Sequence, residues 1–146
     1  MAYTWTDYDI ETTRQFRCNY ETSRPVTPFG LRLRALRAER RLALKDMAAG
    51  LGVSAAYLSA LEHGQRGRPN RRFVHRVCQY LGVIWDDAEA LQRLADISHP
   101  RVTVDTSGLS ARATEFANLL AERIADLPEE SIERMLAEVK ENSADD

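Results

Sequence analysis

The chain has 146 residues, the size of one ordinary domain or of a small domain with an appended segment. Its hydrophobic fraction of 44% is enough for a packed core and argues against global disorder. No apolar run approaches the roughly 18–20 residues that cross a bilayer, and the first residues lack the basic and apolar blocks of a secretory signal. We therefore expect a cytoplasmic protein that does not enter a membrane.

The charges are segregated along the chain, although the formal net charge is only −2. Residues 30–81 contain eleven Lys and Arg against three Asp and Glu, a net charge of +8. Residues 82–146 contain six against fifteen, a net charge of −9. A basic surface for an anionic partner, joined to an acidic segment with another role, would produce this pattern. Two solvated faces of one domain would produce it as well.

Start and stop signals predict a run of short helices from residue 27 onward. Thr27 precedes a proline and is a natural N-cap for the first helix. A second helix over residues 44–51 stops at Gly52, which readily adopts the left-handed conformation. Ser54 then caps a third helix only two residues later. The second and third helices thus have the short glycine-containing turn of a helix-turn-helix.

Two more helices complete the predicted all-α domain. A fourth covers residues 71–81, and a fifth begins at the acidic pair 86–87, which suits the positive end of a helix. Pro100 and Gly108 then interrupt the helical pattern before a further helical segment begins. We predict an N-terminal arm (residues 1–26), a five-helix helix-turn-helix domain (27–97), a linker (98–109) and an acidic helical segment (110–146).

Four spaced motifs carry a resemblance to a known family. They are LRALR in the first helix, DMAAGLGVS across the turn, YLSALEHG in the third helix, and FVHRVCQYLGV in the fourth. Over residues 29–84 the chain resembles the Cro/CI-type, phage-repressor-like (xenobiotic response element) family of helix-turn-helix transcriptional regulators. The resemblance implies sequence-specific binding of double-stranded DNA, transcriptional repression, and a homodimer on a palindromic operator.

The resemblance also implies a structural pair and shows two departures. Arg37 and Glu62 match a family pair that bridges the first and third helices from a largely buried site, where a carboxylate needs a partner. Many members place Gln, which holds a phosphate, where this chain has Leu44. Gly50 inside the second helix is also unusual, and costs up to about 1 kcal/mol relative to Ala.

The third helix is expected to enter the major groove, but its side chains are poor base readers. Alanine can contact only a thymine methyl group, and serine discriminates loosely between bases. Tyr57 is expected either to contact a phosphate or to pack against the neighbouring turn. Direct readout should therefore be weak. By position in the family, the base- or groove-contacting residues are Ser54, Ala55, Ala56, Tyr57, Ser59 and Ala60.

A dense group of donors follows the third helix, and we expect it to hold phosphates or to enter a narrow minor groove. Basic runs can also be solvated surface, but the family position favours DNA contact. A second basic rim precedes the turn at Arg32, Arg34, Arg40, Arg41 and Lys45, and Arg76 extends the first group. The predicted phosphate-binding residues are Lys45, His63, Gln65, Arg66, Arg68, Asn70, Arg71 and Arg72.

The acidic C-terminal segment contains two amphipathic helices that are too short to stand alone in water. They are expected either to pair with a second copy or to pack on their own helix-turn-helix domain, and a dimer would suit a two-fold operator. In an alternative function, an antitoxin-like protein autoregulates through the helix-turn-helix and binds a toxin through this segment. The predicted dimerisation residues are Phe116, Leu120, Ile124, Leu127, Ile132, Met135, Leu136 and Val139.

Nothing in the sequence indicates catalysis. The three histidines are scattered, and neither an HExxH motif nor a glycine-rich phosphate loop is present. Cys18 and Cys78 have no metal-ligand spacing, and Cys78 lies on the apolar face of the fourth helix. We therefore expect no enzyme, no cofactor and no bound metal.

Overall fold

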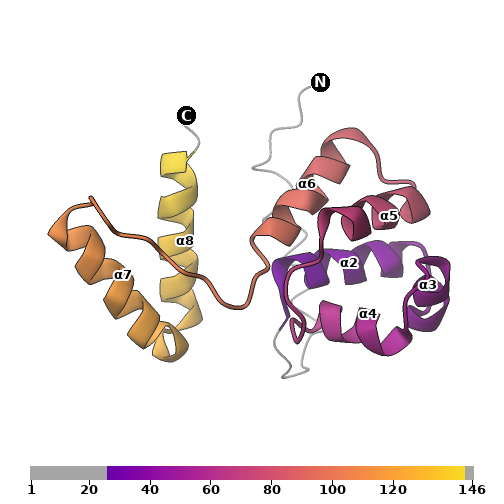
Figure 1. Cartoon of the computed structure of the whole chain (residues 1–146), viewed down its shortest axis with the longest axis horizontal. Helices are drawn as coiled ribbons and strands as arrows, with labels where there is room; N and C mark the ends of the chain where they lie inside the picture. Colours follow the sequence, from indigo (N-terminus) through magenta and orange to yellow (C-terminus); the bar gives the residue numbers. More distant parts are fainter. Residues whose placement is uncertain (1–25, 144–146) are drawn as a thin grey trace. The chain divides into compact units, whose positions relative to one another are not determined.

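The structure is a computed structural model that describes residues 26–143 (Figure 1). These residues form α-helices and one 3₁₀ turn with no strand among them, which confirms the all-α prediction. The chain divides into two compact units, Met1–Arg101 (unit 1) and Val102–Asp146 (unit 2). The predicted N-terminal arm, except its last residue, lies outside the described residues. None of the described helices is long and apolar enough to span a bilayer.

Unit 1 contains the five helices that the sequence predicts. The second predicted helix ends one residue earlier than expected, and the fifth begins one residue earlier, at Trp85, whose φ is +52°. The second and third helices are joined by the short turn of a helix-turn-helix. The helices are α2 (Pro28–Glu39), α3 (Leu44–Gly50), α4 (Ala55–Glu62), α5 (Arg71–Leu81) and α6 (Trp85–Asp96).

The core of unit 1 forms where these helices cross. α2 packs against α4 and α6, while α3 packs against α4 and α5 against α6. All buried side chains of the described residues lie in this unit. The largest of them are Phe29, Leu33, Met47, Leu58, Phe73 and Leu91.

Short-range hydrogen bonds fix where α2 and α4 begin. The Thr27 hydroxyl accepts from the amide of Gly30 at 3.1 Å, and the Ser54 hydroxyl accepts from the amide of Tyr57 at 3.1 Å. Between α3 and α4, Gly52 has a φ of +66°, which a residue with a Cβ adopts only with strain. The turn and the start of α4 are therefore determined by local sequence.

Ser98 belongs to unit 1, and the predicted linker over residues 98–109 therefore begins too early. Ser98 is buried, its hydroxyl accepts from the amide of Phe29 at 2.8 Å, and it donates to the carbonyl of Leu94. The serine thus ties the start of α2 to the end of α6. The division between the two units follows Arg101.

The unusual glycine in α3 has a packing reason. A Cβ at Gly50 would lie 2.1 Å from Cε2 of Tyr80, so a larger residue would collide with the ring. Gly50 therefore leaves room for the partly exposed ring of Tyr80 from α5, which would have to move if residue 50 had a side chain.

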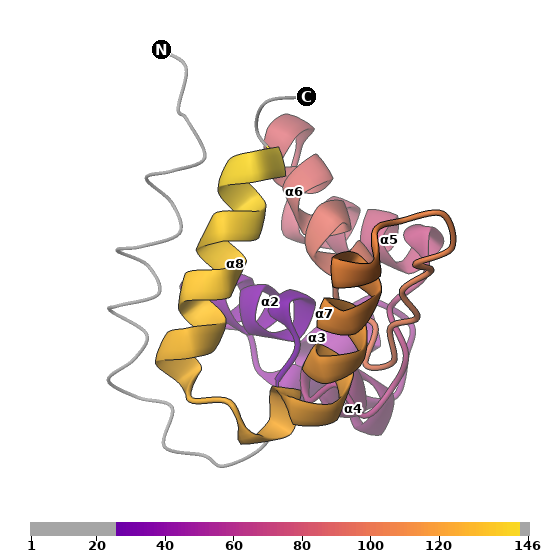
Figure 2. The same ribbon diagram turned by 90° about the vertical axis from the view of Figure 1, so that its left-hand side faces the viewer.

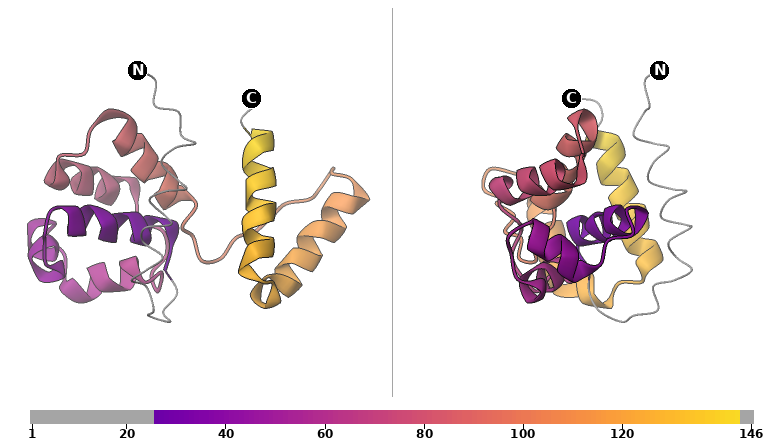
Figure 3. Two further views of the ribbon diagram at one scale, coloured as in Figure 1. Left: turned by 180° about the vertical axis from the view of Figure 1, so that it is seen from behind. Right: turned by 90° about the vertical axis from the view of Figure 1, so that its right-hand side faces the viewer.

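Unit 2 is a pair of helices without a core. The helices α7 (Ala111–Arg123) and α8 (Glu129–Ser143) are joined by the 3₁₀ turn η1 (Ile124–Asp126). They diverge from this turn, as Figures 1, 2 and 3 show from different sides. No residue from 102 to 143 is buried. The amphipathic helices are present, but their apolar faces lack a complete covering.

Candidate nucleic-acid interface

α4 has one side in the core and one side open. Leu58, Leu61 and Glu62 are buried, whereas Ala55 and Ala56 are exposed at the first turn. Ser54 is also exposed, while Tyr57, Ser59 and Ala60 are half-buried. The structure therefore brings the six predicted groove-contacting residues together on or beside the first turns of one helix, with the small side chains outermost.

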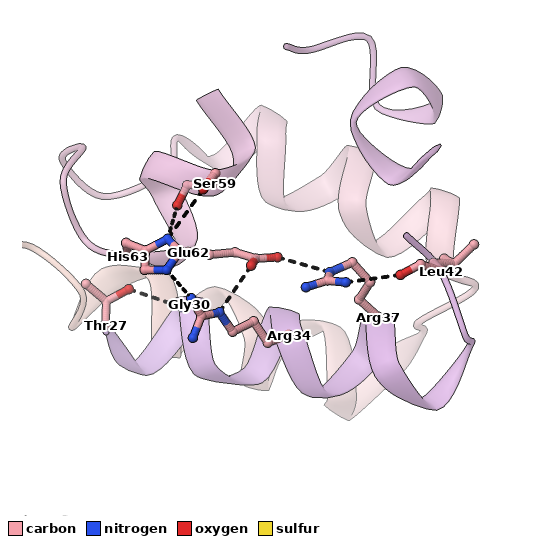
Figure 4. Close-up of polar contacts among 8 residues, drawn as sticks. All are labelled: Thr27, Gly30, Arg34, Arg37, Leu42, Ser59, Glu62 and His63. Carbon is pink, nitrogen blue, oxygen red and sulfur yellow. Dashed lines mark hydrogen bonds and ion pairs between the residues drawn. The ribbon is translucent and has the colours of Figure 1, made fainter. Parts of the chain in front are cut away.

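A buried carboxylate connects α4 to α2. Glu62 is 2% exposed, and its Oε1 lies 3.3 Å from Nε of Arg37, which is the pair that the resemblance implies. Its Oε2 lies 3.2 Å from Nε of Arg34, so the carboxylate is shared by two guanidinium groups (Figure 4). Arg37 also donates to the carbonyl of Leu42 at 3.1 Å. Each oxygen of Glu62 has a charged donor, which offsets the cost of its burial.

Three arginines of the predicted second basic rim have partners within the protein. Arg34 binds Glu62, and Arg40 donates to the carbonyls of Leu81 and Leu36 at 3.0 and 3.2 Å. Arg32 lies 3.5 Å from Glu39. These three side chains therefore use much of their donor capacity within the protein, whereas Arg41 and Lys45 of the same rim are exposed.

His63, at the end of α4, is also engaged inside unit 1. Its Nδ1 lies 2.7 Å from the carbonyl oxygen of Ser59, which can only accept, so Nδ1 is the donor. Its Nε2 faces the guanidinium of Arg34, which can only donate (Figure 4). Both ring nitrogens therefore have partners, and neither is left to donate to a phosphate as the sequence predicted.

A glycine determines how closely α2 approaches α4. A Cβ at Gly30 would lie 2.2 Å from the carbonyl oxygen of Glu62, which is closer than any real contact. The helices can meet at this distance only because residue 30 has no side chain. Together with the Thr27 cap, Gly30 thus sets the position of the α4 terminus relative to α2.

Two aromatic rings pack against each other, and an arginine guanidinium lies over each of them. The rings of Tyr57 on α4 and Phe73 on α5 meet edge to face, with centroids 5.8 Å apart. The guanidinium carbon of Arg66 lies 6.0 Å from the Tyr57 centroid, and that of Arg76 lies 5.6 Å from the Phe73 centroid. Of the two roles expected for Tyr57, the structure shows packing against its neighbours.

The remaining predicted phosphate-binding residues are exposed, but two of them make contacts within the protein. The Asn70 Oδ1 accepts from the amide of Phe73 at 2.8 Å and caps α5, a role that the sequence analysis missed. Arg68 lies 3.4 Å from Asp96, with both side chains more than half exposed. The others are exposed with no ion pair among the described residues, namely Lys45, Gln65, Arg66, Arg71 and Arg72.

The one cysteine of the described range has no reactive setting. Cys78 is 6% exposed in the core of unit 1, and burial raises the pKa of its thiol above the usual value. A protonated, enclosed thiol packs as a small apolar side chain. Within residues 26–143, no group of three or more His, Cys, Asp and Glu side chains is placed to hold a metal ion.

The comparisons agree with this geometry. Residues 28–92 match a family described as a helix-turn-helix domain. The HTH-type transcriptional repressor RghR of Bacillus subtilis (strain 168) is 40% identical over 58 residues, covering 40% of this chain and 43% of that protein. The uncharacterized HTH-type transcriptional regulator RghRB of the same organism is 34% identical over 65 residues, covering 44% of this chain and 47% of that protein.

The match confirms the resemblance of residues 28–92 to the helix-turn-helix domain of transcriptional regulators. The aligned part is less than half the length of each of these relatives. The family match ends at residue 92 and therefore does not include unit 2. No solved structure matches the chain significantly.

Proposed function

Because residues 28–92 form a helix-turn-helix domain, we propose that the chain binds double-stranded DNA and regulates transcription in the cytoplasm, as a repressor. The observation that carries the proposal is the arrangement of α4. One side of the helix is buried and held to α2 by the ion pairs of Glu62, while its first turn is exposed to solvent. The names of the two relatives support the regulatory role.

In this proposal, phosphates supply most of the affinity and bases supply little. Ala55 and Ala56 offer only methyl contacts to the groove, whereas Lys45, Arg66 and Arg71 offer exposed charged donors. Each phosphate contact releases counterions from the DNA, so affinity falls steeply as salt rises. The slope of log affinity against log salt concentration changes by about 0.9 for each contact. We therefore expect a short, loosely defined site and strong non-specific binding.

We also propose that two copies assemble through unit 2 and bind a palindromic operator. Phe116, Ile124, Leu136 and Val139 are 54, 50, 51 and 61% exposed. Leu120, Leu127, Ile132 and Met135 are only half-buried, so all eight predicted dimerisation residues have apolar surface to cover. A two-helix unit without a buried side chain is not stable alone in water, and pairing two such units would give each helix a core.

A selection from randomised duplexes tests the DNA proposal. The full chain should enrich a two-fold symmetric motif whose half-site centres lie about 34 Å apart or a multiple of it. Ala55→Gln should change the base preference at one position of each half-site, because Gln can pair bidentately with adenine. Ala111→Gln, the same change at an exposed position of unit 2, is the control. Failure to enrich any duplex above an unrelated protein would reject the function.

A further inference from the structure

α2 is apolar on two sides. Phe29, Leu33 and Leu36 are buried and pack in the core. On another side of the helix, apolar residues follow at positions i, i+4 and i+7, which places them in one line along its surface. These residues, which we call the α2 stripe, are Leu31, Ala35 and Ala38. Because a surface helix ordinarily has polar residues opposite its core face, the α2 stripe needs a second covering.

The burial of Ala35 indicates that this side of α2 is a packing surface. Ala35 is 7% exposed, whereas Leu31 is 39% exposed and Ala38 is exposed as well. Of the buried apolar residues that the structure describes in unit 1, Ala35 is the one that does not belong to the core cluster. The α2 stripe is therefore distinct from the core.

The charged residues beside the α2 stripe have partners within the protein. Arg32 lies 3.5 Å from Glu39 on one edge of the stripe. Arg34, on the other edge, lies 3.2 Å from Glu62 of α4. An apolar line between charged edges is the composition of a surface that binds protein chain. Since both arginines are neutralised by carboxylates, the stripe suits an apolar occupant better than an anion.

More apolar surface lies at the N-terminal end of the α2 stripe. Val26 is 36% exposed and Ile97 is 67% exposed. The Ser98 hydroxyl accepts from the amide of Phe29 at 2.8 Å, so the end of α6 lies beside the start of α2 (Figure 1). A segment that enters the stripe from this end would cover Val26 and Ile97 as well.

The chain supplies a segment of suitable composition at this end. Residues 1–25 lead directly into Val26 and contain five of the eleven aromatic residues of the chain. Each aromatic side chain can bury about 150–250 Å². The two that are nearest to Val26 in the sequence are Tyr20 and Phe16, six and ten residues before it.

Both rings can reach the α2 stripe. At about 1.5 Å per residue, the seven-residue step from Leu31 to Ala38 is about 10 Å long. An extended chain covers about 3.3 Å per residue, so the segment between Phe16 and Val26 is long enough to turn back along α2. The two alanines of the stripe leave room for rings beside Leu31.

We infer that residues 1–25 pack on the α2 stripe of their own chain, with Phe16 and Tyr20 as the anchors. The contact covers apolar surface that α2 otherwise exposes and adds a second packed layer to unit 1. The inference does not depend on the proposed function, because neither the anchors nor the stripe belong to the residues expected to contact DNA.

Limited trypsin digestion of the full chain tests the inference. Cleavage after Arg14 and Arg17, which flank Phe16, should be slow in the wild type. Leu31→Glu should accelerate it by about tenfold, because a carboxylate in the α2 stripe removes the apolar contact and releases the segment. Val104→Glu adds the same charge at a 64% exposed residue of unit 2 and should leave the rate unchanged.

A reciprocal variant keeps the test valid if Leu31→Glu disturbs the fold. Tyr20→Ser lies outside the core of unit 1 and should accelerate the same cleavages while the melting of the helices stays cooperative. Wild-type cleavage rates in both Leu31→Glu and Tyr20→Ser, or equal acceleration by Val104→Glu, would overturn the inference.

A spin label locates the contact directly. Cys18 lies between the two anchors, whereas Cys78 is buried and its thiol pKa is raised by burial, so a maleimide label modifies Cys18 selectively. The label should broaden the amide signals of residues 31–38 and of Ile97, and Leu31→Glu should restore them. Broadening of other helices in place of α2 would overturn the inference.

Dilution distinguishes the chain's own segment from that of a second copy. Slow cleavage and selective broadening that persist at concentrations too low for self-association support packing within one chain. If both effects disappear on dilution, the segment packs on a second copy and the assignment to its own chain is wrong.

Discussion

Unit 1 and unit 2 are both helical, yet they differ in burial and in charge. Unit 1 contains every buried side chain of the described residues, whereas unit 2 contains none between residues 102 and 143. Residues 1–101 have sixteen Arg and Lys against eleven Asp and Glu, a net charge of +5, while residues 102–146 have four against eleven, a net charge of −7. Both units therefore contain helix-forming sequence, but only unit 1 has the packed core that stabilises a domain by itself.

The contrast leads to opposite expectations for salt. DNA binding by unit 1 should weaken as salt rises, because phosphate contacts release counterions. Assembly through the acidic unit 2 should strengthen, because salt screens the repulsion between like charges while the apolar contact persists. The two activities can therefore be separated in one protein by changing ionic strength or single residues.

The largest expected effect concerns the scaffold of unit 1. Glu62→Ala should lower the free energy of unfolding by roughly 3–5 kcal/mol, because it leaves Arg34 and Arg37 partly buried without a carboxylate. Urea denaturation measures the change. The control is Glu39→Ala, whose half-exposed carboxylate pairs with Arg32 and should contribute at most about 1 kcal/mol. Double-mutant cycles that show no coupling of Glu62 with either arginine would disprove the shared pairing.

The next effect concerns unit 2. Leu136→Glu should weaken self-association by about 1.5–3 kcal/mol, roughly 10- to 150-fold, because a half-exposed leucine would no longer be covered by a second copy. Sedimentation equilibrium measures it. Ala137→Glu, the exposed neighbour on the same helix, adds the same charge and should change little. Equal weakening by both variants would show that charge, not the apolar face, governs assembly.

A smaller effect is expected at the contact between α2 and α4. Gly30→Ala should destabilise unit 1 by about 1–3 kcal/mol, since the added methyl group meets the Glu62 carbonyl and forces the helices apart. Thermal or urea unfolding checks this. Gly67→Ala, with nothing within 4 Å of its added Cβ, is the matched control. A Gly30→Ala protein as stable as wild type would mean that α2 and α4 do not approach this closely in solution.

The smallest effect separates two roles of Tyr57. If its ring positions Arg66, Tyr57→Phe should bind DNA like the wild type, while Tyr57→Leu should match Arg66→Ala in affinity and salt slope. If instead the hydroxyl contacts a phosphate, Tyr57→Phe should lower the slope by about 1. Fluorescence anisotropy over a range of salt distinguishes these outcomes.

Local features of unit 1 could be predicted from the sequence because their causes lie within a few residues. Thr27 and Ser54 cap helices through bonds to residues three positions away, and Gly52 adopts the left-handed turn that its lack of a side chain permits. The pairing of Arg37 with Glu62 was available only through family resemblance, since 25 residues separate the two.

The missed features depend on long-range packing. Nothing in the sequence distinguishes Arg34, which binds Glu62, from the exposed basic residues near it. Ser98 appeared to begin a linker because its partner Phe29 is 69 residues away. Gly30 is required only because α2 and α4 approach each other closely there. His63 contacts Arg34, which lies 29 residues earlier in the sequence, in place of the predicted phosphate.

The central claim is that unit 1 holds DNA mainly through phosphates because α4 presents alanines to the groove. The most direct test is the salt dependence of the full chain's affinity for its best selected duplex and for a scrambled one of equal length. In a plot of log affinity against log salt concentration, we expect the two duplexes to give steep, nearly parallel lines that lie close together. Their slope should be several units, since each phosphate contact contributes about 0.9. A shallow slope with a wide separation between the duplexes would contradict the claim and show that base contacts dominate.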